Sequence, residues 1–264
     1  MTITDGELAV AAAQAGAAVV RARYGTALER FGKGGGDFAT AADIEAEQAI
    51  HAVLRAARPG DAFVGEETGQ TGDAPRTWLV DPLCGTLNFA ARTPLVAVNV
   101  ALRTAAGVTA AASADPFAGE VFWTDGDGAF RRRDGRDEPL VPDAGSALAE
   151  LDVDPPTPNG PAFLAERLLL EPSFRAAFRP RVLSTSLGLL WVADGRRAVY
   201  VIDRDLRDDV HFAAGIAVCR AAGCALSGLR GEPVGAGAHG LVAAADAGTH
   251  TAVLAAVAAV WAGV

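Results

Sequence analysis

Hydrophobic residues recur at helical spacing in the first part of the chain. Across residues 7–24 they return every three or four positions, which predicts an amphipathic helix. A second helix is predicted over residues 40–57, because Thr40 and Asp43 have the spacing of a capping box at a helix start. The glycine-rich residues 32–36 between these helices predict a flexible break.

Short apolar runs bounded by turn residues follow and predict β-strands. Strands are expected at residues 62–64, 77–80 and 96–103. A meander is expected next, at residues 108–113, 120–124 and 128–132, with turns at 115–116 and 125–128.

Residues 133–159 are rich in Pro, Asp and Gly and mark the best candidate for a subdomain boundary. Beyond them, predicted helices at 161–170, 187–193, 212–222 and 249–262 alternate with predicted strands at 181–184, 198–202 and 239–244. This order of elements favours an α+β fold with mixed sheets. We expect an N-terminal α+β half, residues 1–140, and a C-terminal α/β half, residues 141–264, in one compact unit with a shared cleft.

Composition indicates a folded protein and limits its partners. Of the 264 residues, 50% are hydrophobic and 21% are charged, which is typical of a globular chain with a sizeable core. The formal net charge of −9 argues against nucleic acid as a partner, because such binding relies on Lys and Arg contacts to phosphate. A small phosphorylated ligand stays compatible, since a bound cation can reverse the charge locally.

The sequence shows no sign of export or membrane insertion. Its first residues are acidic, unlike a secretory signal, and no apolar run approaches the length of a membrane span. Three widely spaced cysteines do not form a disulfide framework. We therefore expect a cytoplasmic protein without a membrane partner, and its abundant Ala, Arg and Gly with few Lys suggest a bacterial source.

The most informative segment is residues 78–89, Trp-Leu-Val-Asp-Pro-Leu-Cys-Gly-Thr-Leu-Asn-Phe. It predicts a strand that runs into a polar turn carrying a carboxylate (Asp81), a carbonyl (Leu83), a thiol (Cys84) and a hydroxyl (Thr86). Carboxylate and carbonyl oxygens suit a hard divalent cation, and a hydroxyl beside such a cation can orient a water. The amides of Gly85 and Thr86 can point at an anion.

A second acidic segment lies upstream, where Glu66 and Glu67 follow a predicted strand and a glycine. Taken alone, these two residues are equally well explained as a solvated strand end. Together with Asp81, they suggest a metal-dependent phosphatase site.

These segments resemble the inositol monophosphatase family, which belongs with fructose-1,6-bisphosphatase and the bisphosphate nucleotidases. The resemblance also covers Thr-Ala-Ala-Asp at 40–43, the meander from 115 to Gly-Ala-Phe at 128–130, the small residues at 184–187, and residues 211–224. It implies a layered α/β/α/β/α sandwich with mixed sheets, a homodimer, Mg²⁺ as cofactor and a small phosphorylated metabolite as substrate.

The resemblance also implies roles for individual residues. Glu66, Asp81 and the Leu83 carbonyl would hold a first Mg²⁺, with Glu66 also counted as catalytic. Thr86, with Asp43, would orient the attacking water. The amides of Gly85 and Thr86 would bind phosphate oxygens, and Ser184 and Thr185 would contact the substrate.

Two positions depart from the family pattern, which has Asp where this chain has Cys84 and His211. A second metal pocket would offer Asp81, Cys84 and His211, a set that suits Zn²⁺, Mn²⁺ or another transition metal better than Mg²⁺. Three alternatives stay open: the second metal is absent, the site is retuned to a softer ion, or turnover is lost and ligand binding kept. Asp209 is a further candidate to restore a carboxylate.

Other interpretations of the cysteines and the loops are weaker. Cys84 as a nucleophile would need the C-x₅-R loop of cysteine phosphatases, and the next arginine, Arg92, is too distant. Cys219 and Cys224 suit core packing. Residues 32–36 lack the order of a phosphate-binding loop and suggest a mobile flap, in which Lys33 is a possible substrate contact.

The leading hypothesis is a metal-dependent phosphomonoesterase that hydrolyses inositol monophosphate or a related sugar phosphate by direct attack of a metal-activated water. A nucleotide 3′-phosphate or a sugar bisphosphate is the alternative substrate. The charged residues 203–209 are either a solvated loop or a place where Arg204 or Arg207 meets a second anionic group. The rival hypothesis is a catalytically silent protein that binds a phosphorylated ligand on the same scaffold.

Overall fold

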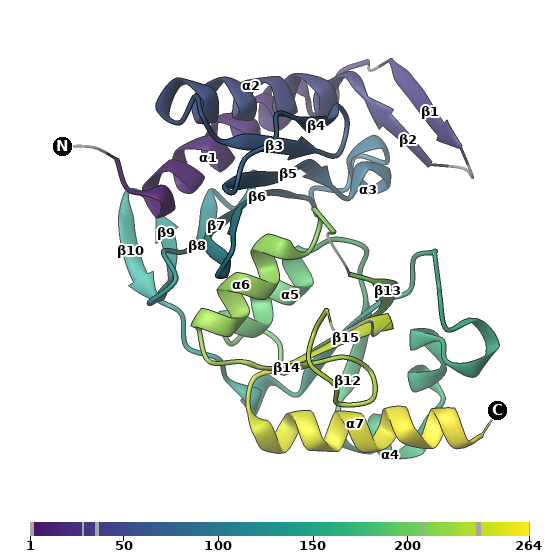
Figure 1. Ribbon diagram of the computed structural model, residues 1–264. Helices are drawn as coiled ribbons and strands as arrows, with labels where there is room; N and C mark the ends of the chain where they lie inside the picture. Colours follow the sequence, from purple (N-terminus) through teal and green to yellow (C-terminus); the bar gives the residue numbers. More distant parts are fainter. Residues whose placement is uncertain (1–2, 28, 35–36, 207–208, 236–238, 264) are drawn as a thin grey trace. The chain divides into compact units, whose positions relative to one another are not determined.

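The computed structural model describes residues 3–27, 29–34, 37–206, 209–235 and 239–263 (Figure 1). The chain forms two compact units. Unit 1 consists of Met1–Pro139, Thr185–Leu187 and Val210–Val218, and unit 2 consists of Leu140–Ser184, Gly188–Asp209 and Cys219–Val264. Two short segments of the second half thus belong to unit 1, so a single cut of the chain does not separate the units.

Unit 1 is built on an eight-stranded mixed sheet with the strand order β10-β9-β8-β7-β6-β5-β3-β4. Strands β3 and β5 are parallel, and the other neighbouring pairs in this sheet are antiparallel. The strands are β3 Ala62–Gly65, β4 Gly69–Thr71, β5 Thr77–Cys84, β6 Ala97–Thr104, β7 Gly107–Asp115, β8 Glu120–Thr124, β9 Ala129–Arg133 and β10 Arg136–Pro139. Every residue of β5 is buried, as expected for a strand covered on both faces.

Helices cover both faces of this sheet. Helices α1 Asp5–Arg23 and α2 Ala41–Ala57 lie side by side over one face and share its main core (Figure 1). A Cβ on Gly16 of α1 would lie 2.7 Å from the Ile50 side chain of α2, so glycine is needed for this close approach. On the other face, alanines at the start of α6 Ala213–Ala221 pack against Leu79 of β5 and alanines of β6 and β7.

The start of α2 lies where the spacing of Thr40 and Asp43 predicts it. The Thr40 hydroxyl accepts a hydrogen bond from the Ala42 amide, and Asp43 Oδ2 accepts one from the Thr40 amide at 2.8 Å. The predicted capping box is therefore confirmed.

Unit 2 contains a five-stranded mixed sheet with the order β12-β11-β13-β15-β14. Its strands are β11 Leu148–Asp152, β12 Arg179–Val182, β13 Val199–Asp205, β14 Ala225–Ser227 and β15 His239–Ala244. Strand β11 runs parallel to both of its neighbours. Helices α7 Ala247–Ala262 and α4 Pro172–Ala177 pack with one face. On the other face lies α5 Leu187–Ala193, where a Cβ on Gly188 would lie 3.0 Å from the Tyr200 ring.

Several predicted elements need correction. Residues 161–170 form two 3-10 turns, Gly160–Ala162 and Ala165–Leu169, because residues 163 and 164 between them are extended. The strand predicted at 181–184 is β12, displaced by two residues toward the N-terminus. The break predicted at 32–36 includes the end of β1 Arg30–Gly34, which pairs with β2 Asp37–Thr40; residues 35–36 lie outside the described residues.

The segment predicted as a boundary, 133–159, also contains the secondary structure of β10, the 3-10 turn Ala144–Ser146 and β11. Short elements elsewhere, namely α3 Thr86–Ala90, α4, β4 and β14, had no predicted counterpart. The α+β class with mixed sheets is confirmed. Within the described residues, no helix has both the length and the apolar character needed to cross a membrane.

Candidate metal and catalytic site

Asp81 and Cys84 lie at the end of β5, where the strand is irregular. Asp81 pairs with Asn99 of β6 and Cys84 pairs with Ala97, so three residue steps on β5 oppose two on β6. Such a bulge admits Pro82, which has no amide hydrogen to donate to a neighbouring strand. Asn99 and Ala97 are two positions apart and share a face of the sheet. The bulge therefore brings Asp81 and Cys84 to one face, although their spacing in a regular strand would separate them.

The chain turns sharply after this bulge. Asp81 Oδ1 accepts a hydrogen bond from the Leu83 amide at 3.0 Å, which is the contact of an Asx turn. Gly85 then adopts φ 105° and ψ 41°, a left-handed conformation that favours glycine, and α3 begins at Thr86. The turn thus leaves the Leu83 carbonyl and the Thr86 hydroxyl close together.

The Thr86 hydroxyl lies between two oxygen acceptors. Its Oγ1 is 3.0 Å from Asp43 Oδ1 and 3.2 Å from the Leu83 carbonyl oxygen. Asp43 is fully buried, and burial raises its pKa above the usual value although its hydrogen bonds to Thr40 and Thr86 oppose the shift. Since the Thr86 proton is directed to an acceptor, the lone pairs of Oγ1 can accept a hydrogen bond from a water.

The buried Asp81 forms an ion pair with His211, whose side chain is partly exposed. Nδ1 of His211, which precedes α6, lies 2.7 Å from Asp81 Oδ2 and 3.9 Å from Glu66 Oε2. Burial raises the pKa of Asp81, but the charge and hydrogen bond of His211 outweigh it and hold this pKa below its usual value. Burial lowers the pKa of His211, yet Asp81 raises it well above that of an ordinary histidine. The metal-free pair is therefore a carboxylate and an imidazolium.

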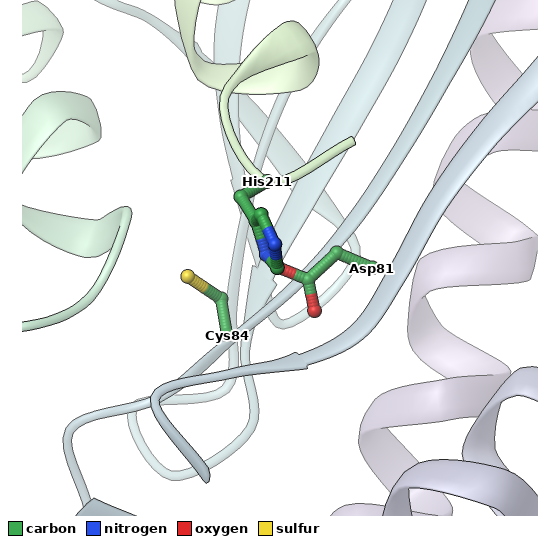
Figure 2. A group of neighbouring side chains, drawn as sticks. All are labelled: Asp81, Cys84 and His211. Atoms are coloured by element: carbon green, nitrogen blue, oxygen red, sulfur yellow. The ribbon is translucent and has the colours of Figure 1, made fainter. Parts of the chain in front are cut away.

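Cys84 completes a compact group of three different donor atoms. The Cys84 sulfur, one carboxylate oxygen of Asp81 and one ring nitrogen of His211 lie within 4.8 Å of one another (Figure 2). Burial raises the pKa of the Cys84 thiol, and the negative charge of Asp81 adds to this effect. The thiol is thus protonated at neutral pH unless a cation displaces the proton.

Glu66 follows β3 on a loop that a buried glutamate holds in place. The amides of Glu67 and Thr68 each donate a hydrogen bond of 2.9 Å to the Glu47 carboxylate. Glu47 is 1% exposed, and a Cβ on Gly65 would lie 2.4 Å from its carboxyl group. Glu47 was not predicted from the sequence, although its position four residues after Asp43 places both acids on one face of α2.

A buried network of polar side chains contacts Asp81 and Cys84. The Asn99 side-chain amide donates to Ser186 Oγ at 2.9 Å and lies 3.4 Å from Asp81 Oδ2. Ser113 Oγ donates to the Asn99 carbonyl oxygen, and the Ser186 amide donates to the Cys84 sulfur at 3.3 Å. These residues were also missed. Asn99 stands within the otherwise apolar run of β6, and this isolated polar residue is the signal that could have identified it.

Two of the predicted substrate contacts have other hydrogen-bonding partners. Thr185 belongs to unit 1, and its buried hydroxyl donates to the Cys84 carbonyl at 3.2 Å. Ser184 belongs to unit 2, where its hydroxyl donates to Asp154. The Asp209 carboxylate forms an ion pair with Arg204 at 3.1 Å.

Other predictions concern residues away from this group. Cys219 is buried and its thiol donates to the Leu189 carbonyl, as expected for a packed core cysteine. Arg207 lies outside the described residues, and the side chain of Lys33 is not described.

Comparison with known proteins identifies the family. The model of the inositol monophosphatase family matches residues 5–262. The chain belongs to this family. An inositol-1-monophosphatase from Caulobacter vibrioides is 41% identical over 180 residues, which cover 65% of this chain and 68% of that protein.

Solved structures of the family show the same fold. An IMPase from Thermotoga maritima superposes with a TM-score of 0.80 at 20% identity, over 95% of both chains. The extragenic suppressor protein suhB from Bartonella henselae has a TM-score of 0.79 at 25% identity, over 95% of this chain and 96% of that one. The predicted inositol monophosphatase fold is confirmed. Membership supports a metal-dependent phosphatase in general terms, without fixing the substrate.

The donor atoms of the site differ in how well they suit Mg²⁺, the metal expected from the family resemblance. Asp81 and the Leu83 carbonyl are oxygen donors of one buried turn, Glu66 is an oxygen donor on the loop after β3, and donors of this kind fit Mg²⁺. Cys84 and His211 offer sulfur and nitrogen, which Mg²⁺ does not favour. The oxygen side of the site therefore fits the expected cofactor, and the sulfur–nitrogen side does not.

Proposed function

We propose that the protein is a metal-dependent phosphomonoesterase that hydrolyses a small phosphorylated metabolite by direct attack of water. Inositol monophosphate or a related sugar phosphate is the proposed substrate. The observation that carries the proposal is the contact of Thr86 Oγ1 with both Asp43 and the Leu83 carbonyl, beside the buried carboxylate of Asp81. Family membership supports the same reaction class.

Three groups are proposed to hold Mg²⁺: the carboxylates of Glu66 and Asp81 and the carbonyl of Leu83. A cation bound there supplies positive charge that stabilises the phosphoryl group and makes a bound water more acidic. Phosphoryl transfer needs mostly positioning and charge neutralisation, so the rigidity of the turn matters. The Asx turn of Asp81 and the Glu47 contacts to the loop after β3 supply this rigidity.

Asp43 and Thr86 are proposed to orient the attacking water. The carboxylate of Asp43 is fixed by hydrogen bonds from the amide and hydroxyl of Thr40, and it accepts a hydrogen bond from the Thr86 hydroxyl. Thr86 Oγ1 then presents its lone pairs, which accept a hydrogen bond from a water and aim an oxygen lone pair of that water at phosphorus. The amides of Gly85 and Thr86 are proposed to bind phosphate oxygens.

The proposed substrate contacts and the alternative substrates come from the family resemblance. Contacts from Ser184 and Thr185, a nucleotide 3′-phosphate or sugar bisphosphate as alternative substrate, and a homodimeric state remain predictions from the family resemblance. Arg204 is engaged with Asp209, so a contact between this arginine and a second anionic group would require that ion pair to open.

One observation favours the rival function, a silent binder of a phosphorylated ligand. The imidazolium of His211 already supplies positive charge to Asp81, so this part of the site is neutralised without a metal. Such a protein would gain thermal stability from a phosphorylated ligand without releasing phosphate.

The test is phosphate release from inositol, sugar and nucleotide monophosphates, each with Mg²⁺, Mn²⁺, Co²⁺ or Zn²⁺. Turnover that depends on the metal and is lost in Thr86→Val supports the phosphatase. Folded protein that is stabilised by a substrate of the panel but releases no phosphate with any ion favours the binder.

A further inference from the structure

We propose that Asp81, Cys84 and His211 form a binding site for a borderline or thiophilic divalent cation, Zn²⁺ or Co²⁺, in preference to Mg²⁺. This site shares Asp81 with the proposed catalytic site. The inference therefore deepens the proposed function, but its test does not depend on turnover.

The first argument is the donor set and its compactness. A sulfur, an oxygen and a nitrogen from three side chains lie within 4.8 Å of one another (Figure 2). Zn²⁺ sites that bind small ligands typically use three protein donors and leave one position open. A chance cluster on a surface would be solvated, whereas Asp81 is 0% exposed, Cys84 is 9% exposed and the His211 side chain is 21% exposed.

The second argument is the bulge that creates the group. Asp81 and Cys84 share a face of the sheet only because β5 carries an extra residue relative to β6. His211 reaches Asp81 from a separate segment, just before α6. Three side chains from two distant parts of the chain thus converge, all within unit 1.

The third argument is the support around each donor. The Ser186 amide donates to the Cys84 sulfur, an interaction that favours a thiolate. The Asn99 amide lies 3.4 Å from Asp81 Oδ2 and is itself fixed by Ser113. Hydrogen bonds of this kind orient metal ligands in known metalloproteins.

A divalent cation balances the charge of this donor set. With a neutral imidazole, the Asp81 carboxylate and the Cys84 thiolate carry two negative charges, which a divalent cation neutralises. Binding releases the thiol proton and the proton shared by His211 and Asp81 to the solvent, and no redox change is involved.

The test is a Co²⁺ titration of the full-length protein after a chelator has removed bound metal. Coordination by a thiolate gives a sulfur-to-cobalt charge-transfer band in the near ultraviolet. We expect this band to saturate at a single ion per chain, to be displaced by Zn²⁺, and to persist in excess Mg²⁺. Folded protein without the band, or a band that Mg²⁺ displaces as readily as Zn²⁺, overturns the proposal.

Substitution of each cysteine in turn identifies the thiolate that gives the cobalt band. Cys84→Ser should abolish it, whereas Cys219→Ser and Cys224→Ser should retain it; the opposite pattern overturns the proposal. If Cys84→Ser does not fold, retention of the band in both control variants still assigns it to Cys84. Asn99→Ala should weaken Co²⁺ binding about 10- to 100-fold while the band keeps its position, as expected for a positioning residue.

A reverse substitution tests the preference itself. The double variant Cys84→Asp/His211→Asp should lose the band and bind Mg²⁺ more tightly than the parent by calorimetry. Unchanged Mg²⁺ affinity in the folded double variant contradicts the inference. Phosphate release with Mg²⁺ in a parent without the band overturns only this inference, and a band without phosphate release under any ion overturns only the proposed function.

Discussion

The imidazole Nδ1 of His211 lies 2.7 Å from Oδ2 of the fully buried Asp81. The family resemblance predicts a carboxylate at each of these positions, and two adjacent carboxylates repel each other unless a metal or a proton lies between them. Here one of the two residues is itself a cation, because the pKa of His211 is raised well above its usual value. The metal-free protein can therefore fold with its site neutralised.

Removal of the His211 imidazolium should make the stability of the fold depend on a bound metal ion. His211→Ala leaves the Asp81 carboxylate buried without its ion-pair partner, a change that costs about 3 kcal/mol of unfolding free energy. We expect a lower Tm than the parent in chelator, and a larger rise in Tm on addition of Mg²⁺. An equal Tm for variant and parent in chelator would show that the pair does not matter for stability.

The hydroxyl of Thr86 should matter for turnover more than for substrate binding. Thr86→Val removes the group that contacts Asp43, and loss of a positioned water lowers kcat by about 100-fold or more with little change in KM. Thr86→Ser keeps the hydroxyl and serves as the control, with most of kcat retained. A similar kcat for the valine variant and the parent would remove Thr86 from the mechanism.

Gly65 should not tolerate a side chain. A Cβ there would lie 2.4 Å from the Glu47 carboxyl group, which holds the loop carrying Glu66. Gly65→Ala should lower the unfolding free energy by about 1–3 kcal/mol, the range for overpacking, as measured by urea denaturation. Gly60→Ala is the matched control, because a Cβ at Gly60 meets nothing within 4 Å; equal stability of both variants contradicts the packing argument.

The alternation of apolar residues was sufficient to predict the long elements. Helices α1, α2 and α7 were predicted close to their observed bounds, since each buries one regular face. The meander of β6 to β9 was also predicted closely, because its strands are short runs bounded by turn residues. The short elements depend on tertiary contacts instead. Strand β11 lies in a segment with the composition of a linker, and its buried Glu150 is acceptable because Arg197 pairs with it at 2.7 Å.

The sequence predicted the candidate site only in part, for a similar reason. The sequence motif identified Asp81, Leu83, Cys84 and Thr86, because one turn carries all four. Asn99, Ser113 and Ser186 contact the site across the fold, where spacing in sequence carries no information about contact, whereas Glu47 could have been found from its spacing to Asp43. The bulge in β5 was also not predicted: it depends on the pairing with β6, and the strand was expected to end before Pro82.

Asp152 in unit 2 gives a pH-dependent prediction that is independent of the metal site. Burial raises its pKa to about 6, so the fold favours the protonated acid over the carboxylate. In the unfolded chain the pKa of Asp152 is about 4. Below that pH, Asp152 is protonated in both the folded and the unfolded state and does not lower the free energy of unfolding. As pH rises through about 6, the cost grows to about 3 kcal/mol, from roughly two pKa units.

Asp152→Asn should remove most of this cost. We expect its Tm to exceed that of the parent at pH 7 and the two to converge near pH 4, as followed by thermal melts. Asp73→Asn, at an exposed aspartate of unit 1, is the control and should not show this pattern. A variant that is less stable than the parent at pH 7 would contradict the assigned direction.

The most direct test of the central claim is phosphate release by metal-free protein before and after Mg²⁺ is restored, with inositol monophosphate and sugar phosphates as substrates. The account predicts turnover that requires the ion and is abolished by Asp81→Asn and by Glu66→Gln, both of which remove a carboxylate proposed to hold it. Near-parent activity in either folded variant, or turnover that persists in chelator, would contradict the proposed metal site.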